Sequence, residues 1–150
     1  MNVSTPRFLG VIAIMAVTLI ASADASAPAG RYTMAAGTVY DNKTKLTWQQ
    51  TVSSTEYSWA DAKTYCTGLG ASLGGTGWRL PTVKELQTLI DHSQSSPSID
   101  STAFPATPAS WFWSSSPLAG DPSYAWRVEF LIGMTGRSHV SEAYLVRCVR

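Results

Sequence analysis

The stretch "GTGWRLPTVKELQTLI" (residues 75–90) decides the fold of this chain, because it marks the place where a helix must begin. Pro81 cannot donate a backbone hydrogen bond and disfavours a helical conformation at Leu80. Thr82 and Glu85 have the spacing of a capping box, in which each side chain accepts a hydrogen bond from the backbone N–H of the other residue. We therefore predict a helix that starts at Thr82 and ends near residues 91–92. Its apolar face consists of Val83, Leu86, Leu89 and Ile90.

The Trp-Arg-Leu-Pro tetrad (residues 78–81) allows two interpretations. In the structural one, Trp78 and Leu80 fill the core, and Arg79 pairs with a carboxylate or with backbone carbonyls. In the functional one, Trp78 and Arg79 form a ligand platform, because an aromatic face stacks on sugars and arginine pairs with sulfate or carboxylate. The tetrad joins two elements and leads into a capping box, so it favours a structural motif made of Trp78, Arg79, Leu80, Pro81 and Glu85.

A second helix is predicted over residues 57–70. Ser58 suits the N-cap, and Asp61 in the first turn complements the helix dipole. Gly70 is a typical helix stop, and the glycine-rich residues 71–77 predict a connection without regular structure. Four residues of this helix share one apolar face, which directs Cys66 towards the core: Trp59, Ala62, Cys66 and Leu69.

The remaining segments predict β-structure and one long loop. Residues 37–50 form a hairpin around "DNKTK", and residues 110–117, 123–133 and 143–150 form strands. Residues 134–139 form a turn, and residues 93–110 form a loop anchored by Ile99 and Phe104. Alternation places Arg127 and Glu129 on the solvent face of one strand and Cys148 on the core face of the last. Segregated helices and strands predict an α+β fold with two helices packed on an antiparallel sheet.

The N-terminus predicts an exported protein. Arg7 precedes an uncharged apolar run of 14 residues, and "ADASA" offers a signal peptidase site. We therefore expect a signal peptide over residues 1–27, export by the general secretory route, and a mature domain over residues 28–150. An uncleaved anchor is the alternative, although the run is short for a membrane span. After cleavage we expect no membrane span, and a periplasmic, cell-surface or extracellular location.

The two cysteines, Cys66 and Cys148, both fall in the predicted mature domain. Exported proteins mature in an oxidising compartment, where a disulfide is the default. A core-facing helix cysteine and a core-facing cysteine in the last strand are compatible with one bond. Two free reactive thiols are the alternative.

Several segments, in order along the chain, resemble the C-terminal globular domain of the bacterial collagen-like adhesin Lcl: "VYDNKTKLTWQQ", "GWRLPTVKELQTLID", "FWSSSP", "AWRVEF" and "YLVRCVR". The resemblance implies a C-type-lectin-like fold closed by a bond between the helix cysteine and the last-strand cysteine. It also implies an adhesin-like surface role with sulfated glycans as ligands. The chain has no Gly-x-y collagen repeat, so the avidity of a collagen-driven trimer is not expected.

A modest basic patch near the C-terminus is the predicted glycan surface. Its members are Arg127, Arg137 and Arg147, with Trp111 and Trp113 as adjoining aromatics. An ordinary solvated sheet face is the alternative interpretation. The other function predicted for such a domain is an envelope structural or protein-interaction role, with a cell-surface protein as partner. The net charge of +1 argues against nucleic acid as a ligand.

Metal binding and catalysis find little support in the sequence. No run supplies the six to eight oxygens that Ca²⁺ requires, and the sugar-binding triplets of calcium-dependent lectins are missing. We find no HExxH, nucleophile-elbow or P-loop pattern. Formylglycine-generating enzymes share the lectin-like class but work through cysteines, which here are better explained as structural. We expect a non-catalytic module without metal or cofactor.

Overall fold

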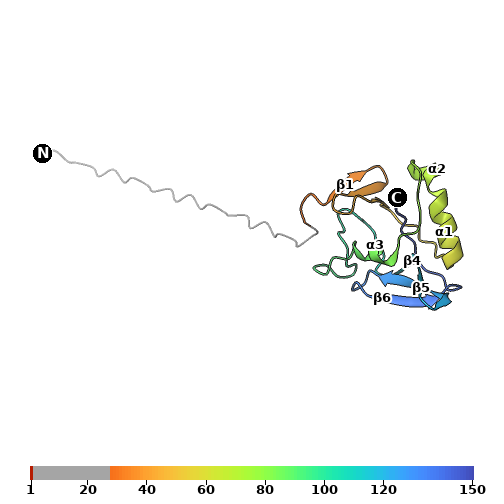
Figure 1. The fold of residues 1–150 in the computed structure, drawn as a ribbon. Helices are drawn as coiled ribbons and strands as arrows, with labels where there is room; N and C mark the ends of the chain where they lie inside the picture. The colour runs from red at the N-terminus through yellow and green to blue at the C-terminus, as the bar shows by residue number, and fades with distance from the viewer. Residues whose placement is uncertain (2–27) are drawn as a thin grey trace.

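The computed structural model describes Met1 and residues 28–150, so the predicted signal peptide lies outside the described residues. The described chain is α+β, as predicted (Figure 1). Its strands are β1 (Tyr32–Ala35), β2 (Thr38–Asp41), β3 (Thr47–Gln49), β4 (Trp111–Leu118), β5 (Asp121–Glu129) and β6 (Thr135–His139). Its helices are α1 (Trp59–Gly68), α2 (Gly70–Leu73) and α3 (Val83–Gln87).

The first sheet is the antiparallel ladder β1-β2-β3, which confirms the predicted hairpin between β2 and β3. The C-terminus extends this sheet, because Val149 bridges to Trp48 on one side and to Arg79 on the other. Arg79 and Val149 exchange both backbone hydrogen bonds, at 2.9 and 3.0 Å between N and O. The Trp-Arg-Leu-Pro tetrad (residues 78–81) is therefore fixed in the molecule by backbone pairing with the end of the chain.

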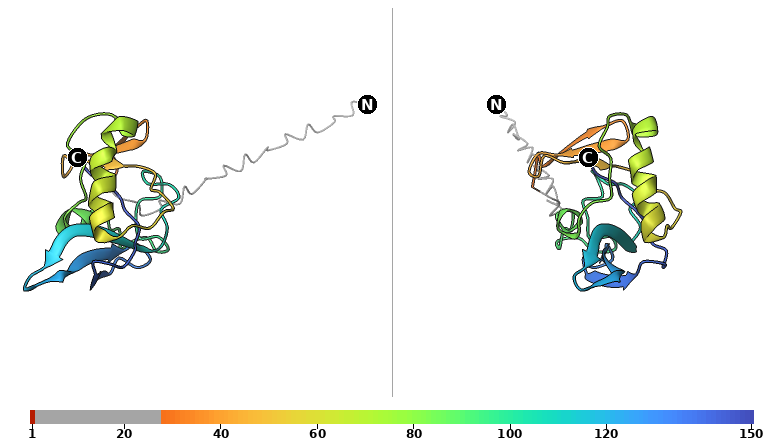
Figure 2. Two further views of the ribbon diagram at one scale, coloured as in Figure 1. Left: turned by 90° about the vertical axis from the view of Figure 1, so that its right-hand side faces the viewer. Right: turned by 45° about the vertical axis from the view of Figure 1, so that its right-hand side comes forward.

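The second sheet is the antiparallel ladder β4-β5-β6, whose β4–β5 hairpin projects from the rest of the domain (Figure 2). The prediction of a turn at residues 134–139 is wrong, because β6 pairs with β5 from Thr135 to His139. The predicted last strand is also wrong as a continuous strand. Residues 143–150 form only isolated bridges, at Tyr144, Leu145 and Val149, and so connect the two sheets.

The helices confirm the predicted caps but not all the predicted lengths. Ser58 accepts a hydrogen bond from the Asp61 N–H at the start of α1, and Thr82 and Glu85 form the full capping box of α3. Helical structure does not end at Gly70 as predicted, because Leu69 keeps a helical conformation and α2 begins at Gly70. Gly74, with a φ of 71°, ends α2 instead. Helix α3 has only five residues, and Leu89 is buried from the turn that follows it.

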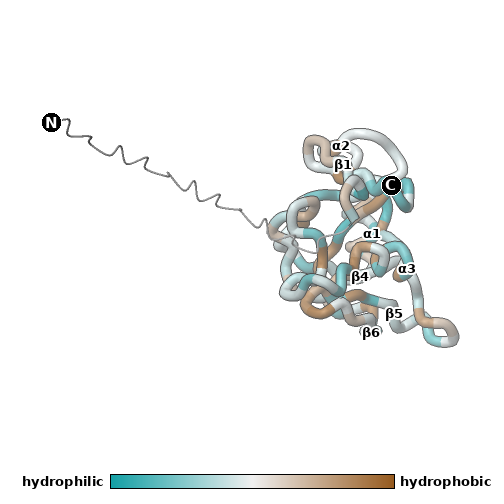
Figure 3. The backbone as a smooth tube through the Cα atoms, turned by 90° about the vertical axis from the view of Figure 1, so that its left-hand side faces the viewer, coloured by the Kyte–Doolittle hydropathy of each residue, from teal (hydrophilic) through white to brown (hydrophobic). Residues whose placement is uncertain are grey.

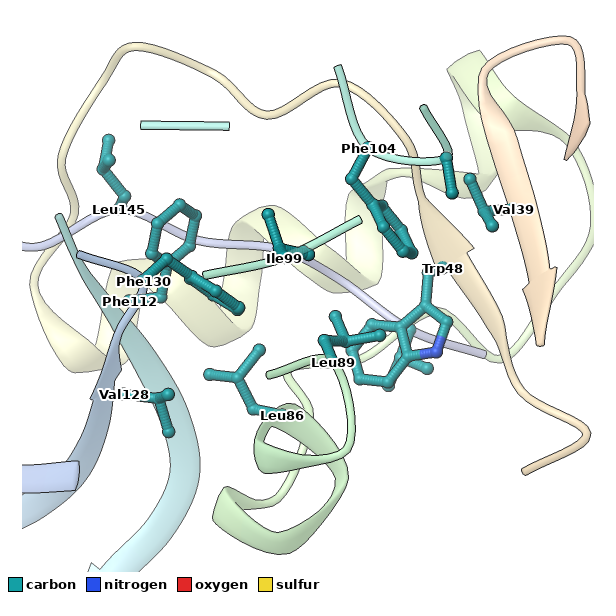
Figure 4. Packing of buried hydrophobic residues seen from close by; sticks show 12 residues of the cluster. Val39, Trp48, Leu86, Leu89, Ile99, Phe104, Phe112, Val128, Phe130 and Leu145 are labelled. Carbon is teal, nitrogen blue, oxygen red and sulfur yellow. The ribbon is translucent and has the colours of Figure 1, made fainter. Parts of the chain in front are cut away.

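Two hydrophobic clusters fill the interior, one on each face of β4. Neighbouring strand residues point to opposite faces, and Phe112 and Trp113 are both fully buried. Phe112 belongs to the same cluster as Leu86 of α3 and the anchors Ile99 and Phe104, which are buried as predicted (Figure 4). Trp113 packs in the second cluster with residues of α1. The helices therefore do not form one layer on one face of a sheet.

The disulfide between Cys66 and Cys148 is present, with the two Cα atoms 5.4 Å apart and both side chains fully buried. It joins α1 to the C-terminal segment across 82 positions of sequence. Short hydrophobic and hydrophilic stretches alternate along the described chain (Figure 3), and none of its helices meets the length and hydropathy required to cross a membrane.

Candidate functional site

The five residues predicted as a basic and aromatic patch do not form one surface. Arg147 was expected on the solvent face, and this prediction is wrong because its side chain is fully buried. Its Nη1 donates to the carbonyl oxygens of Gln49 and Gln50, at 2.9 and 2.7 Å. Its Nη2 donates to the hydroxyl of Thr107 at 2.6 Å, and its guanidinium lies 4.6 Å from the ring centroid of Phe104.

The environment of Arg147 explains why strand alternation failed there. The C-terminal segment is irregular, so side chains do not alternate strictly between two faces. The arginine does not face solvent but binds the carbonyl oxygens of Gln49, the last residue of β3, and of Gln50, which follows it. No carboxylate of the described residues pairs with it, and burial therefore lowers the pKa of Arg147 to about 9.

Trp113 was expected as an exposed aromatic, and this prediction is also wrong. Its side chain is fully buried, and its Nε1 donates to the carbonyl oxygen of Tyr57 at 2.9 Å. Arg137 is exposed, but it lies opposite Trp126 in the β5–β6 register, whereas Arg127 lies opposite Gly136. Adjacent positions along β5 point to opposite faces, so Arg127 and Arg137 belong to different faces of the sheet.

Arg127 and Trp111 do come together, and Tyr144 completes their arrangement. The guanidinium carbon of Arg127 lies 4.0 Å from the ring centroid of Trp111 and 4.3 Å from that of Tyr144. We call these three residues the arginine sandwich. They come from β5, β4 and the C-terminal segment respectively. Gly136 on β6 makes room for the indole, because a Cβ there would lie 3.1 Å from two atoms of the Trp111 ring.

The guanidinium in the sandwich has no hydrogen-bond or ion-pair partner among the described residues, and its Nε is buried without one. Burial raises the pKa of Tyr144, whose hydroxyl donates to Glu142 at 2.5 Å and lies 3.1 Å from the Ser138 hydroxyl. That bond from Tyr144 lowers the pKa of the Glu142 carboxyl. The charge of Arg127 also lowers the pKa of Glu142, but Glu142 is hydrogen-bonded to Tyr144 and forms no ion pair with the guanidinium, which can still pair with an external anion.

The tetrad adopts the geometry expected of a structural motif. Trp78 and Leu80 are buried, and the Trp78 Nε1 donates to the Gly74 carbonyl at 2.9 Å. Arg79 donates to both oxygens of Glu85, at 2.8 and 2.7 Å. These bonds lower the pKa of Glu85 to about 2. The charge of Arg79 is therefore already paired.

No group of three or more histidine, cysteine or acidic side chains in the described chain is arranged to hold a metal ion. The sequence identified Arg127 and Trp111 but missed Tyr144 and Gly136. Tyr144 lies four positions before Cys148, so the alternation that directs Cys148 to the core would direct Tyr144 there too. A signal for Gly136 was its position between two polar residues of β6, but a glycine there is equally typical of a turn.

Comparison with known proteins identifies the family to which the chain belongs. A search of curated protein sequences finds no match to the chain. The family model described as the Lcl C-terminal domain matches residues 37–150, which contain every residue of the arginine sandwich and both cysteines. The match covers most of the chain and agrees with the resemblance carried by its motifs, and the chain therefore belongs to the Lcl C-terminal domain family.

Proposed function

We propose that this domain is an exported, adhesin-like binding module that recognises sulfated glycans through the arginine sandwich. The observation that carries the proposal is the guanidinium of Arg127, held between Trp111 and Tyr144 without an ion pair or a hydrogen bond among the described residues. A planar guanidinium with free donors pairs with sulfate oxygens, and aromatic edges beside it offer contact for a sugar ring. Family membership is consistent with a surface domain of this kind.

Several features support the wider setting of this proposal. A buried disulfide is typical of extracellular and periplasmic proteins, which fits export by the general secretory route. The bond from a helix to the C-terminal segment is also the feature that a C-type-lectin-like fold would require. Both cysteines of the chain are committed to it, which favours binding over a cysteine-dependent catalytic role such as formylglycine generation.

A protein-interaction role without a glycan is the second candidate, and one observation favours it. The turn between β5 and β6 exposes three large apolar side chains, Leu131, Ile132 and Met134, with 38, 54 and 51% of their surfaces accessible. Neighbouring exposed apolar groups of this kind occur at protein contacts. A protein partner docking there would leave the arginine sandwich free, so the two roles can be separated by mutation.

The test is a titration of oxidised residues 28–150 with fucoidan, heparin and chondroitin sulfate at low and physiological salt. Arg127→Gln removes the charge in the sandwich, and Arg137→Gln removes an exposed charge from the other face of the same sheet. We expect saturable binding that weakens with salt. We expect the Arg127 variant to bind about tenfold more weakly, the loss of one charge-assisted contact.

The Arg137 variant should bind within about twofold of the wild type, since a distant surface charge contributes little. Equal losses in the two variants would mean that only the overall charge matters and would contradict the proposed site. A folded, disulfide-bonded protein that binds none of the three polymers at low salt would remove the glycan proposal. The exposed apolar turn would then become the leading functional surface.

A further inference from the structure

A second site lies between α1, the residues after Trp78, and β4. A hollow of about 430 Å³ is lined by Lys63, Thr67, Arg79, Leu80, Thr82 and Ser115. This volume is in the range of pockets that hold small molecules. None of these residues belongs to the arginine sandwich.

The walls of the hollow are fixed by contacts that do not depend on a ligand. The Ser115 N–H donates to the Pro81 carbonyl at 2.7 Å and ties β4 to the tetrad. The bidentate pair with Glu85 holds the Arg79 side chain along one wall. The disulfide holds α1 in place on the other side. A preformed hollow loses less entropy on binding than one that must close around its ligand.

The charge in the hollow is limited to one available cation. Arg79 is paired with Glu85, whereas no carboxylate of the described residues forms an ion pair with Lys63. The Lys63 ammonium lies 3.2 Å from the centroid of the Trp59 ring. That ring is itself fixed, since its Nε1 donates to the Ser114 carbonyl at 2.7 Å. The ammonium is therefore held at a defined place beside the hollow.

The chemistry of the lining selects one class of ligand. The exposed side chains of Thr67 and Thr82 carry methyl groups that suit the C–H face of a sugar ring, and the buried Leu80 lies beneath them. A single ammonium suits a carboxylate attached directly to that ring. A sulfate ester is bulkier and needs several donors, which this hollow does not offer because Arg79 is occupied. We propose that the hollow is a uronate subsite, which takes the carboxylate-bearing ring of an acidic glycan; this extends the glycan-binding role proposed above and rests on it.

The test uses a uronate ligand that carries no sulfate. Oxidised residues 28–150 are titrated calorimetrically with oligogalacturonate and with its methyl ester, in which the carboxylates are neutralised. Lys63→Gln removes the ammonium, and Thr67→Tyr fills the hollow from an exposed position of α1. Lys84→Gln, an exposed lysine of α3 that does not line the hollow, is the matched control. Thermal unfolding of each variant verifies that it is folded.

We expect saturable binding of oligogalacturonate and much weaker binding of the ester. Lys63→Gln should weaken binding by about three- to fivefold, the effect of one partly exposed ion pair. Thr67→Tyr should abolish binding, and Lys84→Gln should leave it unchanged. The absence of saturable binding at low salt, or equal losses in the Lys63 and Lys84 variants, would overturn the uronate subsite.

A parallel titration with fucoidan, a sulfated polymer, separates this proposal from the sulfate site. Arg127→Gln should weaken fucoidan binding and leave oligogalacturonate binding unchanged. If Arg127→Gln has no effect on fucoidan while Lys63→Gln still weakens oligogalacturonate binding, the sulfate site fails and the uronate subsite stands. If Arg127→Gln weakens fucoidan binding while Lys63→Gln leaves oligogalacturonate binding unchanged, the sulfate site stands and the uronate subsite is wrong.

Discussion

Replacing Arg147 with methionine should destabilise the fold, although its position near the C-terminus suggests a surface residue. Methionine keeps much of the aliphatic volume and removes the guanidinium. The carbonyl oxygens of Gln49 and Gln50 and the hydroxyl of Thr107 then lose their donor. A buried polar group left without its partner costs about 1–3 kcal/mol.

The net effect is smaller than the sum of these losses. Thr107 still donates its hydroxyl to the Phe104 carbonyl at 2.8 Å, so it loses only its role as an acceptor. Removing a buried charge also relieves its desolvation, which offsets part of the cost. We expect the free energy of unfolding to fall by about 2–4 kcal/mol. For a domain of this size that corresponds to a melting temperature lower by roughly 8–16 °C.

Urea denaturation followed by tryptophan fluorescence measures this difference, with Arg137→Met as the matched control at an exposed position. The control should change the free energy of unfolding by less than about 0.5 kcal/mol. A loss in Arg147→Met as small as that in the control would refute the argument that the buried guanidinium holds these carbonyls. The same result would mean that Arg147 is accessible to solvent, as the sequence analysis predicted when it included Arg147 in the basic patch.

Three further predictions concern the capping box, the disulfide and the sandwich. Glu85→Gln should lower the free energy of unfolding by about 1–2 kcal/mol at neutral pH, as measured by urea denaturation. The pKa of Glu85 falls from 4.5 to about 2 on folding, so this difference from wild type should shrink as the pH falls through that interval. Reducing the bond between Cys66 and Cys148 should lower the free energy of unfolding by roughly 4–5 kcal/mol, measured with and without reductant. Gly136→Ala should displace the Trp111 ring and weaken fucoidan binding by about two- to fivefold, with little change in melting temperature.

Local signals in the sequence predicted the elements that local physics determines. The capping box of Thr82 and Glu85 and the N-cap at Ser58 involve contacts within one helical turn, and both are present. The orientation of Cys66 followed from helical periodicity, and the disulfide confirms it. The loop anchors Ile99 and Phe104 were predicted because isolated apolar residues in a polar loop are stabilised by burial.

The sequence-based predictions were wrong where contacts between distant parts of the chain determine the local structure. Strand β6 has few β-forming residues, and it exists because β5 offers a free edge for pairing. Arg147 lies inward because the carbonyls that it satisfies come from residues nearly a hundred positions away in sequence. Tyr144 joins the arginine sandwich through a segment that alternation treats as regular strand. The site could therefore be predicted only in part, as Arg127 and Trp111 without the residues that complete it.

The most direct test of the central claim is an NMR titration that follows the Nε–H resonances of the arginine side chains while a sulfated oligosaccharide is added. Binding at the sandwich predicts a saturable shift of the Arg127 resonance, with a dissociation constant equal to that from calorimetry and with Arg137 unaffected. A shift of Arg137 or Arg150 with no change at Arg127 would contradict the account, because the ligand would then bind elsewhere on the surface.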